Sequence, residues 1–402
     1  MQKKLITLAI AGALAIPGAA MADVTAKSDA DINVYGKIHA SWDYVNVANT
    51  GAGSDSKDDN TGVFRNSRLG FKGAEDLGNG LKGIWQVETL LNTTSSTGNS
   101  GSVGLRNTFV GLEGDNWGKV FVGRHDTPYK MATAKLDIFS DTIADYNNII
   151  GAHMMPGTSA GTSVVGTVSG IGTPVIATTA ATNASVASNF NEREPQVVAY
   201  VTPNFNGFQA AIARESWQNN EVAGSEELEG WSLMGMYDQG PFFASLSYED
   251  QSGGANASTA GADAEAWKVG AGYRFGNSTV GAVYEDIDHK SNSYKSASRG
   301  AFMLNAAHKF GANELKVAYG KAKDSDANNN DGADTWAIGI DHNFSKRTKV
   351  YAIYTQMNND TNGNYGLYTG QNNGDADGDA FYESNAAGRD LDALSVGIIH
   401  SF

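Results

Sequence analysis

The chain has 402 residues, and its 29 lysines and arginines face 44 aspartates and glutamates, which gives a formal net charge of −15. It contains no cysteine, which excludes a disulfide framework and cysteine-based zinc or iron–sulfur sites. The acidic balance argues against nucleic acid as a main partner. The aromatic content of 10% argues against a disordered chain.

The first 22 residues have the layout of a secretory signal peptide. Lys3 and Lys4 form a positive start, residues 5–16 form an apolar run, and residues 20–22 form a small-residue cleavage site. A membrane anchor is the alternative, but the run is too short to cross ~30 Å of hydrocarbon. We therefore expect a cleaved signal peptide, 1–22, and a mature exported chain, 23–402.

The mature part shows a two-residue alternation of apolar and polar side chains, which is the period of a β-strand. Within residues 267–275, Trp267 and Val269 share one face while Lys268 and Arg274 share the other. The same alternation occurs in residues 242–248, 302–310, 315–319 and 336–344. The charged face is too hydrophilic for a shared dry core, which disfavours a soluble β-sandwich. Aromatic residues at the ends of the apolar faces fit the interfacial girdles of a membrane barrel.

Short turns and long polar loops alternate along the chain. Short turns are expected at residues 75–80, 115–118, 204–207, 239–241, 276–277, 311–313 and 344–347. Long loops are expected at residues 46–61, 93–101, 218–227, 251–262, 290–297, 324–332 and 358–388. With one further connection, these fifteen links join sixteen strands, and an even number closes an antiparallel sheet. We predict an all-β fold, a 16-stranded antiparallel transmembrane β-barrel, because unpaired backbone groups are too costly in lipid.

The last strand is the first of several segments that resemble a known family. Its outward residues end at an aromatic: Leu394, Val396, Ile398, His400 and Phe402. This end resembles the signal read by the barrel-assembly machinery of Gram-negative outer membranes, so Phe402 is the expected assembly signal. Four further segments, 67–73, 74–82, 109–112 and 123–129, are similar to those of the general trimeric porins of Gram-negative bacteria.

This resemblance implies a water-filled channel in the outer membrane for passive diffusion of ions and small hydrophilic solutes. It also implies a homotrimer, and we expect contact with outer-membrane lipid and lipopolysaccharide. The seven histidines are scattered without metal-ligand spacing, so we expect no metal, no cofactor and no catalytic residue. Two alternatives stay open. A substrate-selective channel would show a ladder of aromatic or basic residues along the lumen, and an outer-membrane hydrolase or adhesin is the other, although the sequence shows no credible Ser/His/Asp set.

The remaining connection, residues 125–191, is too long for an ordinary loop. In the porins it resembles, the third long loop folds inward and its acidic residues face wall arginines across a constriction. Asp137, Asp141 and Asp145 are spaced by four, which would put them on one face of a helical turn. A solvated loop face is the alternative.

The family pattern implies lumen-facing arginines, and motif matching places them at Arg68, Arg106 and Arg193, with Arg124 as an addition. Arg68 is opposite in phase to its apolar neighbours, as a lumen residue should be. Arg106 is in phase with Val110 and Leu112, which conflicts with that position. A surface-exposed arginine is the alternative for each.

Three features leave pore size and ion preference open. Residues 157–187 form an insertion almost without charge, which could plug the pore, cover its mouth or lie outside. The acidic run 375–379 is similar to a calcium loop but lacks the glycine and glutamate that an EF-hand needs. Acidic loops favour cations, whereas arginines at a constriction favour anions.

Overall fold

The computed structural model describes residues 31–48, 57–91, 104–151, 190–217, 228–252, 263–290, 298–326, 330–368, 381–382 and 387–402. The predicted signal peptide, the insertion 157–187 and the acidic run 375–379 lie outside the described residues. Among the described residues, no helix is long and apolar enough to cross a membrane.

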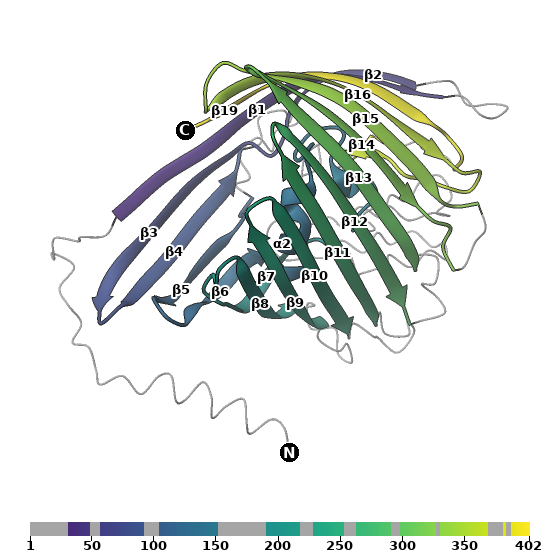
Figure 1. The fold of residues 1–402 in the computed structure, drawn as a ribbon. Coiled ribbons are helices and arrows are strands. Elements are labelled where there is room, and N and C mark those ends of the chain that lie inside the picture. The colour runs from purple at the N-terminus through teal and green to yellow at the C-terminus, as the bar shows by residue number, and fades with distance from the viewer. Residues whose placement is uncertain are drawn as a thin grey trace.

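One large antiparallel sheet forms the wall of the molecule (Figure 1). Its strands are β1 (Asp31–Val47), β2 (Lys57–Phe64), β3 (Arg68–Gly78), β4 (Leu81–Leu90), β5 (Thr108–Gly114), β6 (Gly118–Asp126), β7 (Arg193–Val201), β8 (Phe208–Trp217), β9 (Leu228–Gln239), β10 (Phe242–Ser252), β11 (Ala264–Phe275), β12 (Ser278–His289), β13 (Arg299–Phe310), β14 (Asn313–Ala322), β15 (Ala333–Asn343), β16 (Thr348–Asn359) and β19 (Leu391–Ser401). The short strands β17 (Leu367–Tyr368) and β18 (Phe381–Tyr382) pair separately. Three short helices follow β6: α2 (Pro128–Thr133), η1 (Ala134–Leu136) and η2 (Tyr146–Asn148).

The sheet closes into a barrel at β1, which pairs with β19 on one side and with β2 and β3 on the other. Residues 40–47 of β1 pair with β2, and residues 31–37 pair with β3. Together β2 and β3 therefore form one crossing, interrupted at residues 65–67, where Asn66 has a φ of 45°. The 17 strands of the sheet thus make the sixteen crossings that the sequence predicts, and the predicted barrel is confirmed.

The strand ends confirm the seven short turns. β11 and β12, for example, are joined through residues 276–277, and β15 and β16 through residues 344–347. The first long loop is shorter than expected, because Asn46 pairs with Asp58 and extends both strands into residues 46–61. The ladder therefore keeps backbone groups paired in a stretch where the sequence pattern has already turned polar.

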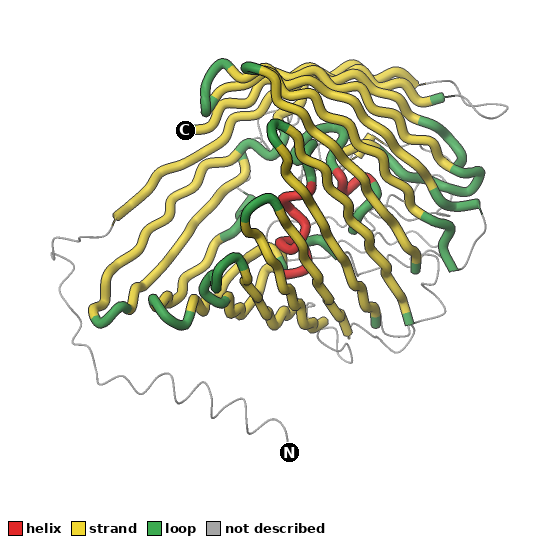
Figure 2. The backbone as a smooth tube through the Cα atoms, viewed as in Figure 1, coloured by secondary structure: helices red, strands yellow, loops and turns green. Residues whose placement is uncertain are grey.

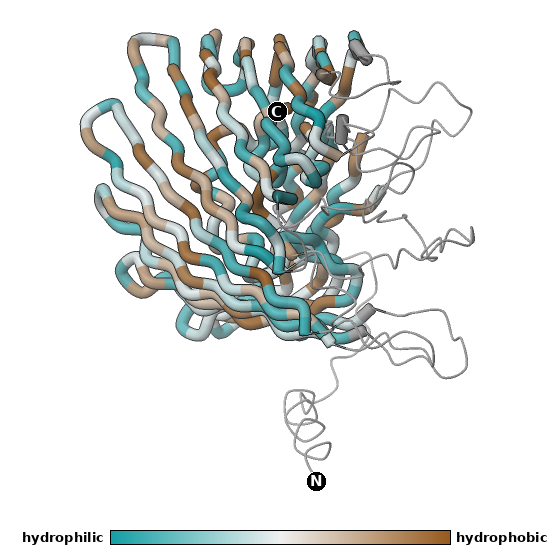
Figure 3. The backbone as a smooth tube through the Cα atoms, turned by 90° about the vertical axis from the view of Figure 1, so that its right-hand side faces the viewer, coloured by the Kyte–Doolittle hydropathy of each residue, from teal (hydrophilic) through white to brown (hydrophobic). Residues whose placement is uncertain are grey.

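The outer face of the wall is apolar, as the alternation predicts. On β11, Trp267 is 41% exposed and Val269 is 39% exposed, whereas Lys268 between them is fully buried. Figure 3 shows the same alternation of hydrophobic and hydrophilic residues along the wall strands. An isolated barrel with its large apolar side chains outward and its charges inward has the polarity that lipid around it and water within it would require.

The first part of the long connection, residues 127–151, packs against the inner face of the wall. Figure 2 shows its helices within the curve of the sheet. Four of its apolar residues are buried against inward side chains of the wall strands β12, β13 and β16: Phe139, Ile143, Ile149 and Ile150. This segment therefore packs its apolar side against one part of the wall. Its polar residues are on the other side, which faces the lumen.

Candidate functional site

Wall side chains hold the long connection by its backbone carbonyl groups. Three such hydrogen bonds run from Asn305 to the Leu136 carbonyl (2.6 Å), from Lys316 to the Ile138 carbonyl (3.0 Å) and from Arg299 to the Ile149 carbonyl (2.6 Å). A buried carbonyl without a partner costs free energy, so these donors stabilise an irregular backbone inside the barrel.

Glycines on the inner face make room for the apolar side chains of this segment. A Cβ atom on Gly270 would lie 2.7 Å from Leu136 Cδ1, and one on Gly339 would lie 2.8 Å from Phe139 Cε1. Real Cβ atoms do not approach other atoms so closely, so a larger residue at either position would force the packed side chains of the segment to shift. The glycines at these two positions thereby allow Leu136 and Phe139 to pack directly against the inner wall.

On the lumen side of the segment, the Asp141 side chain contacts cationic side chains of the wall strands β1 and β3. Its carboxylate forms an ion pair with Lys37 and lies 3.7 Å from Arg68 Nη1. Asn66 Nδ2 donates to Asp141 Oδ1 over 2.7 Å. Burial alone would raise the pKa of Asp141, but the positive charges of Lys37, Arg68 and Arg106 hold that pKa well below its usual value.

Arg106 lies in the same group of charges, although the sequence alternation placed it with the lipid-facing residues. Its Nε donates to Glu88 Oε1 over 2.6 Å, and its Nη1 donates to Asn66 Oδ1 over 3.2 Å. Tyr35 donates its hydroxyl to the other oxygen of Glu88 over 2.9 Å. The carboxylate of Glu88 is thus held between a guanidinium and a phenol.

An irregularity in the pairing of β4 with its neighbour explains the position of Arg106. Gln86 pairs with Phe109, and Thr89 bridges to Leu105, so three steps along one strand face four along the other. One extra residue reverses the alternation of side chains beyond it. Arg106 therefore points inward although Val110, at the same parity, is 60% exposed on the outside.

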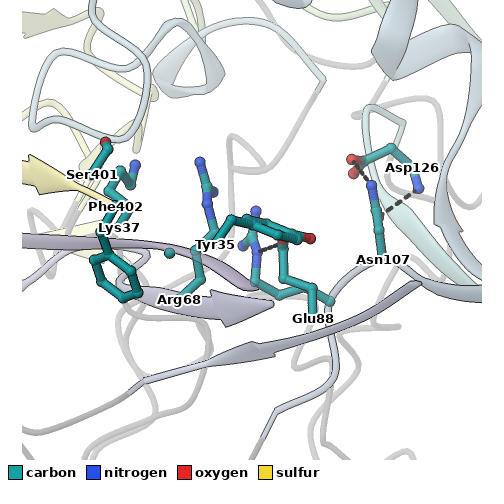
Figure 4. Close-up of a pocket in the computed structure, with 10 residues that line it drawn as sticks. Tyr35, Lys37, Arg68, Glu88, Asn107, Asp126, Ser401 and Phe402 are labelled. Atoms are coloured by element: carbon teal, nitrogen blue, oxygen red, sulfur yellow. Dashed lines mark hydrogen bonds and ion pairs between the residues drawn. The ribbon is translucent and has the colours of Figure 1, made fainter. Parts of the chain in front are cut away.

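A cavity of about 460 Å³ lies beside these charges (Figure 4). It is lined by Tyr35, Gly36, Lys37, Arg68, Glu88, Arg106, Asn107, Asp126, Ser401 and Phe402. We use the term neck for five charged residues at this level of the barrel: Lys37, Arg68, Arg106, Glu88 and Asp141. Three of them are cationic and two are anionic, so charges of both signs face one space.

Arg193 belongs to an adjoining network. Its Nη2 lies 2.9 Å from Asp126 Oδ1, and its Nε donates to Asn107 Oδ1 over 2.6 Å. Asp126 and Asn107 line the cavity and Arg193 does not, so Arg193 acts on the cavity only through its contacts with these two residues. Arg124 is not among the lining residues, and the charges that act on it most strongly are those of Arg193 and Glu194. The structure therefore brings Arg68 and Arg106 to Asp141 and leaves Arg124 apart.

The predicted helical turn through the three aspartates is wrong. The helix η1 ends at Leu136, and Asp141 has a φ of 61°, which a helix does not allow. Asp137 Oδ1 accepts from the Phe139 amide over 3.1 Å, and Asp145 Oδ2 accepts from the Asp141 amide over 2.7 Å. Such local bonds from side chain to backbone compete with helix formation.

Asp137 and Asp145 therefore shape the turn, and only Asp141 of the three contacts wall cations. Burial raises the pKa of the Asp137 carboxyl, and the nearby charge of Asp145 raises it further. Burial also raises the pKa of Asp145, against the hydrogen bonds that it accepts from Asn147.

The sequence did not predict four residues that belong to the neck or contact it: Lys37, Asn66, Glu88 and Tyr368. Lys37 could have been found, because it is out of phase with the lipid-facing Ile38 and Trp42. Asn66 could not, because its position depends on the break between β2 and β3. Nor could Tyr368, which accepts from Asn66 at its hydroxyl over 2.8 Å and donates its amide to Asn148 over 2.9 Å.

Among the residues that the structure describes, no cluster of three or more histidine or carboxylate side chains is arranged to hold a metal ion.

A closed sheet with an apolar outer face and a charged cavity within defines a membrane-spanning barrel of the channel-forming class. A sequence profile described as Gram-negative porin matches residues 7–363. The chain belongs to the Gram-negative porin family. It is an outer-membrane porin, and its function is that of a passive channel.

Individual relatives agree with this assignment. Outer membrane porin protein 32 of Delftia acidovorans is 28% identical over 410 residues, which cover 100% of both chains. Major outer membrane protein P.IB of Neisseria meningitidis serogroup B is 29% identical, over 87% of this chain and 91% of its own. Among solved structures, an anion-selective porin from Comamonas acidovorans has a TM-score of 0.69 at 23% identity, covering 93% of this chain and 100% of that one. OmpF of Salmonella typhi has a TM-score of 0.62 at 18% identity, covering 92% and 97%. The two structures support the fold.

Proposed function

We propose that solutes cross this porin through the neck, and that the neck sets which ions and small hydrophilic solutes pass. The observation that carries the proposal is the approach of Asp141, on the inward segment, to Lys37 and Arg68 on the wall beside a cavity of about 460 Å³. Fixed charges of opposite sign across a narrow space produce a transverse field. Polar solutes orient in such a field, while apolar solutes must displace ordered water from it.

The carboxylate of Asp126, which also lines the cavity, is balanced by its ion pair with Arg193. The neck is thus left with one more positive than negative charge, which favours a weak preference for anions. The similar porin from Comamonas acidovorans is described as anion-selective, which is in line with this proposal. The net charge of −15 for the whole chain acts against it through the surface potential, so the preference should be small.

A reversal potential across a planar bilayer under a potassium chloride gradient tests this proposal. We expect a small potential of the sign that chloride permeation produces, and a clear cation preference would contradict it. Liposome swelling with sugars of graded size tests general diffusion. We expect rates that fall smoothly with solute size, whereas a saturable response to a single sugar would show a substrate-selective channel.

We also propose export through cleavage after Ala22, and a role for Phe402 in assembly. Phe402 donates its amide to the Gly36 carbonyl over 3.1 Å and accepts from the Gly36 amide over 3.0 Å, at the seam where the barrel closes. An alanine at this position keeps these main-chain bonds, so this replacement tests the aromatic side chain as the assembly signal. Phe402→Ala should lower the amount of folded protein in the outer membrane, and an unchanged yield would contradict this role.

We propose a homotrimer with neighbouring lipopolysaccharide and no enzymatic activity. One similar structure, OmpT of Vibrio cholerae, is described as a trimer form. A trimer would cover part of the apolar outer face between neighbouring copies. Heat-labile oligomers should appear on a gel after extraction in mild detergent, and a monomer under those conditions would overturn the proposal.

A further inference from the structure

Three strands carry the same pattern at their turn ends, on the lipid-facing side. The pattern is histidine, any residue, phenylalanine, and it occurs at residues 308–310, 342–344 and 400–402. It belongs to β13, β15 and β19, which alternate with β14 and β16 in one continuous stretch of the wall. The three histidines are exposed and in phase with lipid-facing residues such as Leu304, Ile338 and Val396.

Each of these imidazoles is oriented by a polar side chain on the neighbouring strand. The Nδ1 atom lies 2.8 Å from an oxygen of the first residue of that strand in all three cases. The pairs are His308 with Ser278 Oγ, His342 with Asn313 Oδ1, and His400 with Thr348 Oγ1. Since Nδ1 is engaged within the wall, the second ring nitrogen, Nε2, is left for a partner outside the barrel.

The phenylalanines indicate that the three histidines lie at the boundary between the apolar belt and the turns. Phe310, Phe344 and Phe402 are 44%, 65% and 44% exposed, and each ring contacts its histidine at centroid distances of 4.8 to 6.5 Å. Aromatic side chains at strand ends mark the level of the lipid headgroups. Arg347, an exposed residue of the turn before β16, lies next to the end of β19, where its carbonyl accepts from the Ser401 amide over 2.8 Å.

We propose that the imidazole row, His308, His342 and His400, binds phosphate groups of phospholipid headgroups in the leaflet on the short-turn side. A hydroxyl can donate to Nδ1 at His308 and at His400, which leaves the ring proton on Nε2 as a donor to a phosphate oxygen. At His342 the partner is an amide oxygen, which accepts from Nδ1. The contact should therefore be strongest at His308 and His400 and weaker at His342.

Lipid is the expected occupant because the imidazole row combines the features of a headgroup site. Hydrogen-bond donors and the cation Arg347 lie at the polar edge of an apolar surface, and a phosphate group carries the opposite charge. A second copy of this chain is the other possible occupant, and the experiments below separate the two.

The direct test is solid-state NMR on protein with ¹⁵N-labelled histidine in bilayers of phosphatidylethanolamine with phosphatidylglycerol. Dephasing of imidazole ¹⁵N signals by lipid ³¹P reports close approach, and the single variants His308→Gln, His342→Gln and His400→Gln assign the signals. We expect strong dephasing at His308 and His400 and a weaker effect at His342. The buried inner-face residues His39 and His289 serve as internal controls and should show none. Absence of dephasing at both His308 and His400 would overturn the proposal.

A second measurement uses the triple variant H308Q/H342Q/H400Q in dodecyl maltoside micelles, which contain no phosphorus. Native mass spectrometry should show fewer molecules of added phosphatidylglycerol retained by the folded variant than by the wild type. Equal retention would contradict a headgroup site. Loss of oligomers in the variant without loss of lipid would show that the row faces another copy, and it would also overturn the proposal. If the triple variant does not fold, H308Q alone is measured in the same way.

Discussion

Asn66 on the wall donates a hydrogen bond of 2.7 Å to the carboxylate of Asp141 on the long connection. The same amide nitrogen lies 2.8 Å from the Tyr368 hydroxyl, and Asn66 Oδ1 accepts from Arg106. One uncharged side chain therefore joins the wall, the inward segment and the last long loop. Asn66 can reach all three because it lies in the break between β2 and β3, where the strand direction is not fixed by a ladder.

Replacement of Asp141 by asparagine should shift the channel toward anions. The change removes one of the two negative charges of the neck and leaves Lys37 and Arg68 without their shared partner. The excess of positive charge then grows from one to two. The reversal potential in a potassium chloride gradient measures the shift. Asp137→Asn is the matched control, because Asp137 makes no ion pair with the wall in the described structure. The asparagine also keeps the oxygen that accepts a hydrogen bond from the Phe139 amide. An equal shift in both variants would contradict the assignment of Asp141 to the neck.

Replacement of Arg68 by glutamine should shift the channel in the opposite direction, toward cations. The Arg68 side chain is 25% exposed to the lumen, and its loss brings the neck charge to zero. Arg214→Gln is the control, since Arg214 pairs with an exposed glutamate and is not a residue of the cavity lining. We expect the control to leave the reversal potential unchanged, and a shift of similar size there would mean that surface potential, and not the neck, sets selectivity.

The barrel itself could be predicted from the sequence, because the alternation of apolar and polar residues within each strand shows which face meets lipid and which faces the lumen. The position of Lys268 between Trp267 and Val269 already indicates which face of β11 is turned inward. The turn positions follow from where the same alternation stops. Arg68 was predictable for that reason. Arg106 was not predictable from parity, because the extra residue between Leu105 and Phe109 has no local signature in the sequence.

The interior of the barrel was harder to predict because its segments follow no repeat. The spacing of Asp137, Asp141 and Asp145 suggested a helix, yet their carboxylates bond to nearby amides and hold a turn instead. The contact of Tyr368 with Asn66 joins residues 302 positions apart, which no sequence pattern reveals. Interior contacts therefore had to come from the structure.

Replacement of Gly270 by valine should move the inward segment away from the wall and change the pore. A new Cβ would lie 2.7 Å from Leu136 Cδ1 and 3.0 Å from Thr133 Cγ2, and overpacking of this kind costs about 1–3 kcal/mol. Swelling rates with graded sugars should change, while the barrel still forms. Gly235→Val is the matched control, because nothing described lies within 4 Å of its Cβ position on the wall. Unchanged rates in Gly270→Val would show that the segment is not held by this contact.

Replacement of Arg65 by alanine should destabilise the barrel. Arg65 is fully buried, pairs with the equally buried Asp43, and donates to Ser41 Oγ over 3.0 Å and to the Tyr368 carbonyl. Removal of one member of a buried ion pair leaves an uncompensated charge and costs about 3–5 kcal/mol. The urea midpoint of unfolding, followed by gel mobility, should fall. Restoration of the midpoint in the double variant R65A/D43A would support the pairing, and a wild-type midpoint in R65A would contradict it.

The effect of Asp141 on selectivity should persist in acid. An ordinary aspartate loses half of its charge near about pH 3.9, but the wall cations hold the pKa of Asp141 well below that value. Since the folded-state pKa is depressed, the charge and its ion pairs are present above the lowered value and are lost only when the pH falls through it. The difference in reversal potential between wild type and Asp141→Asn should therefore be nearly the same at about pH 4 as at about pH 7. Taking the difference removes the contributions of other titrating groups that both proteins share. A difference that shrinks by half at about pH 4 would mean that Asp141 titrates as an exposed carboxylate, and the contact with Lys37 and Arg68 would then not hold in the membrane.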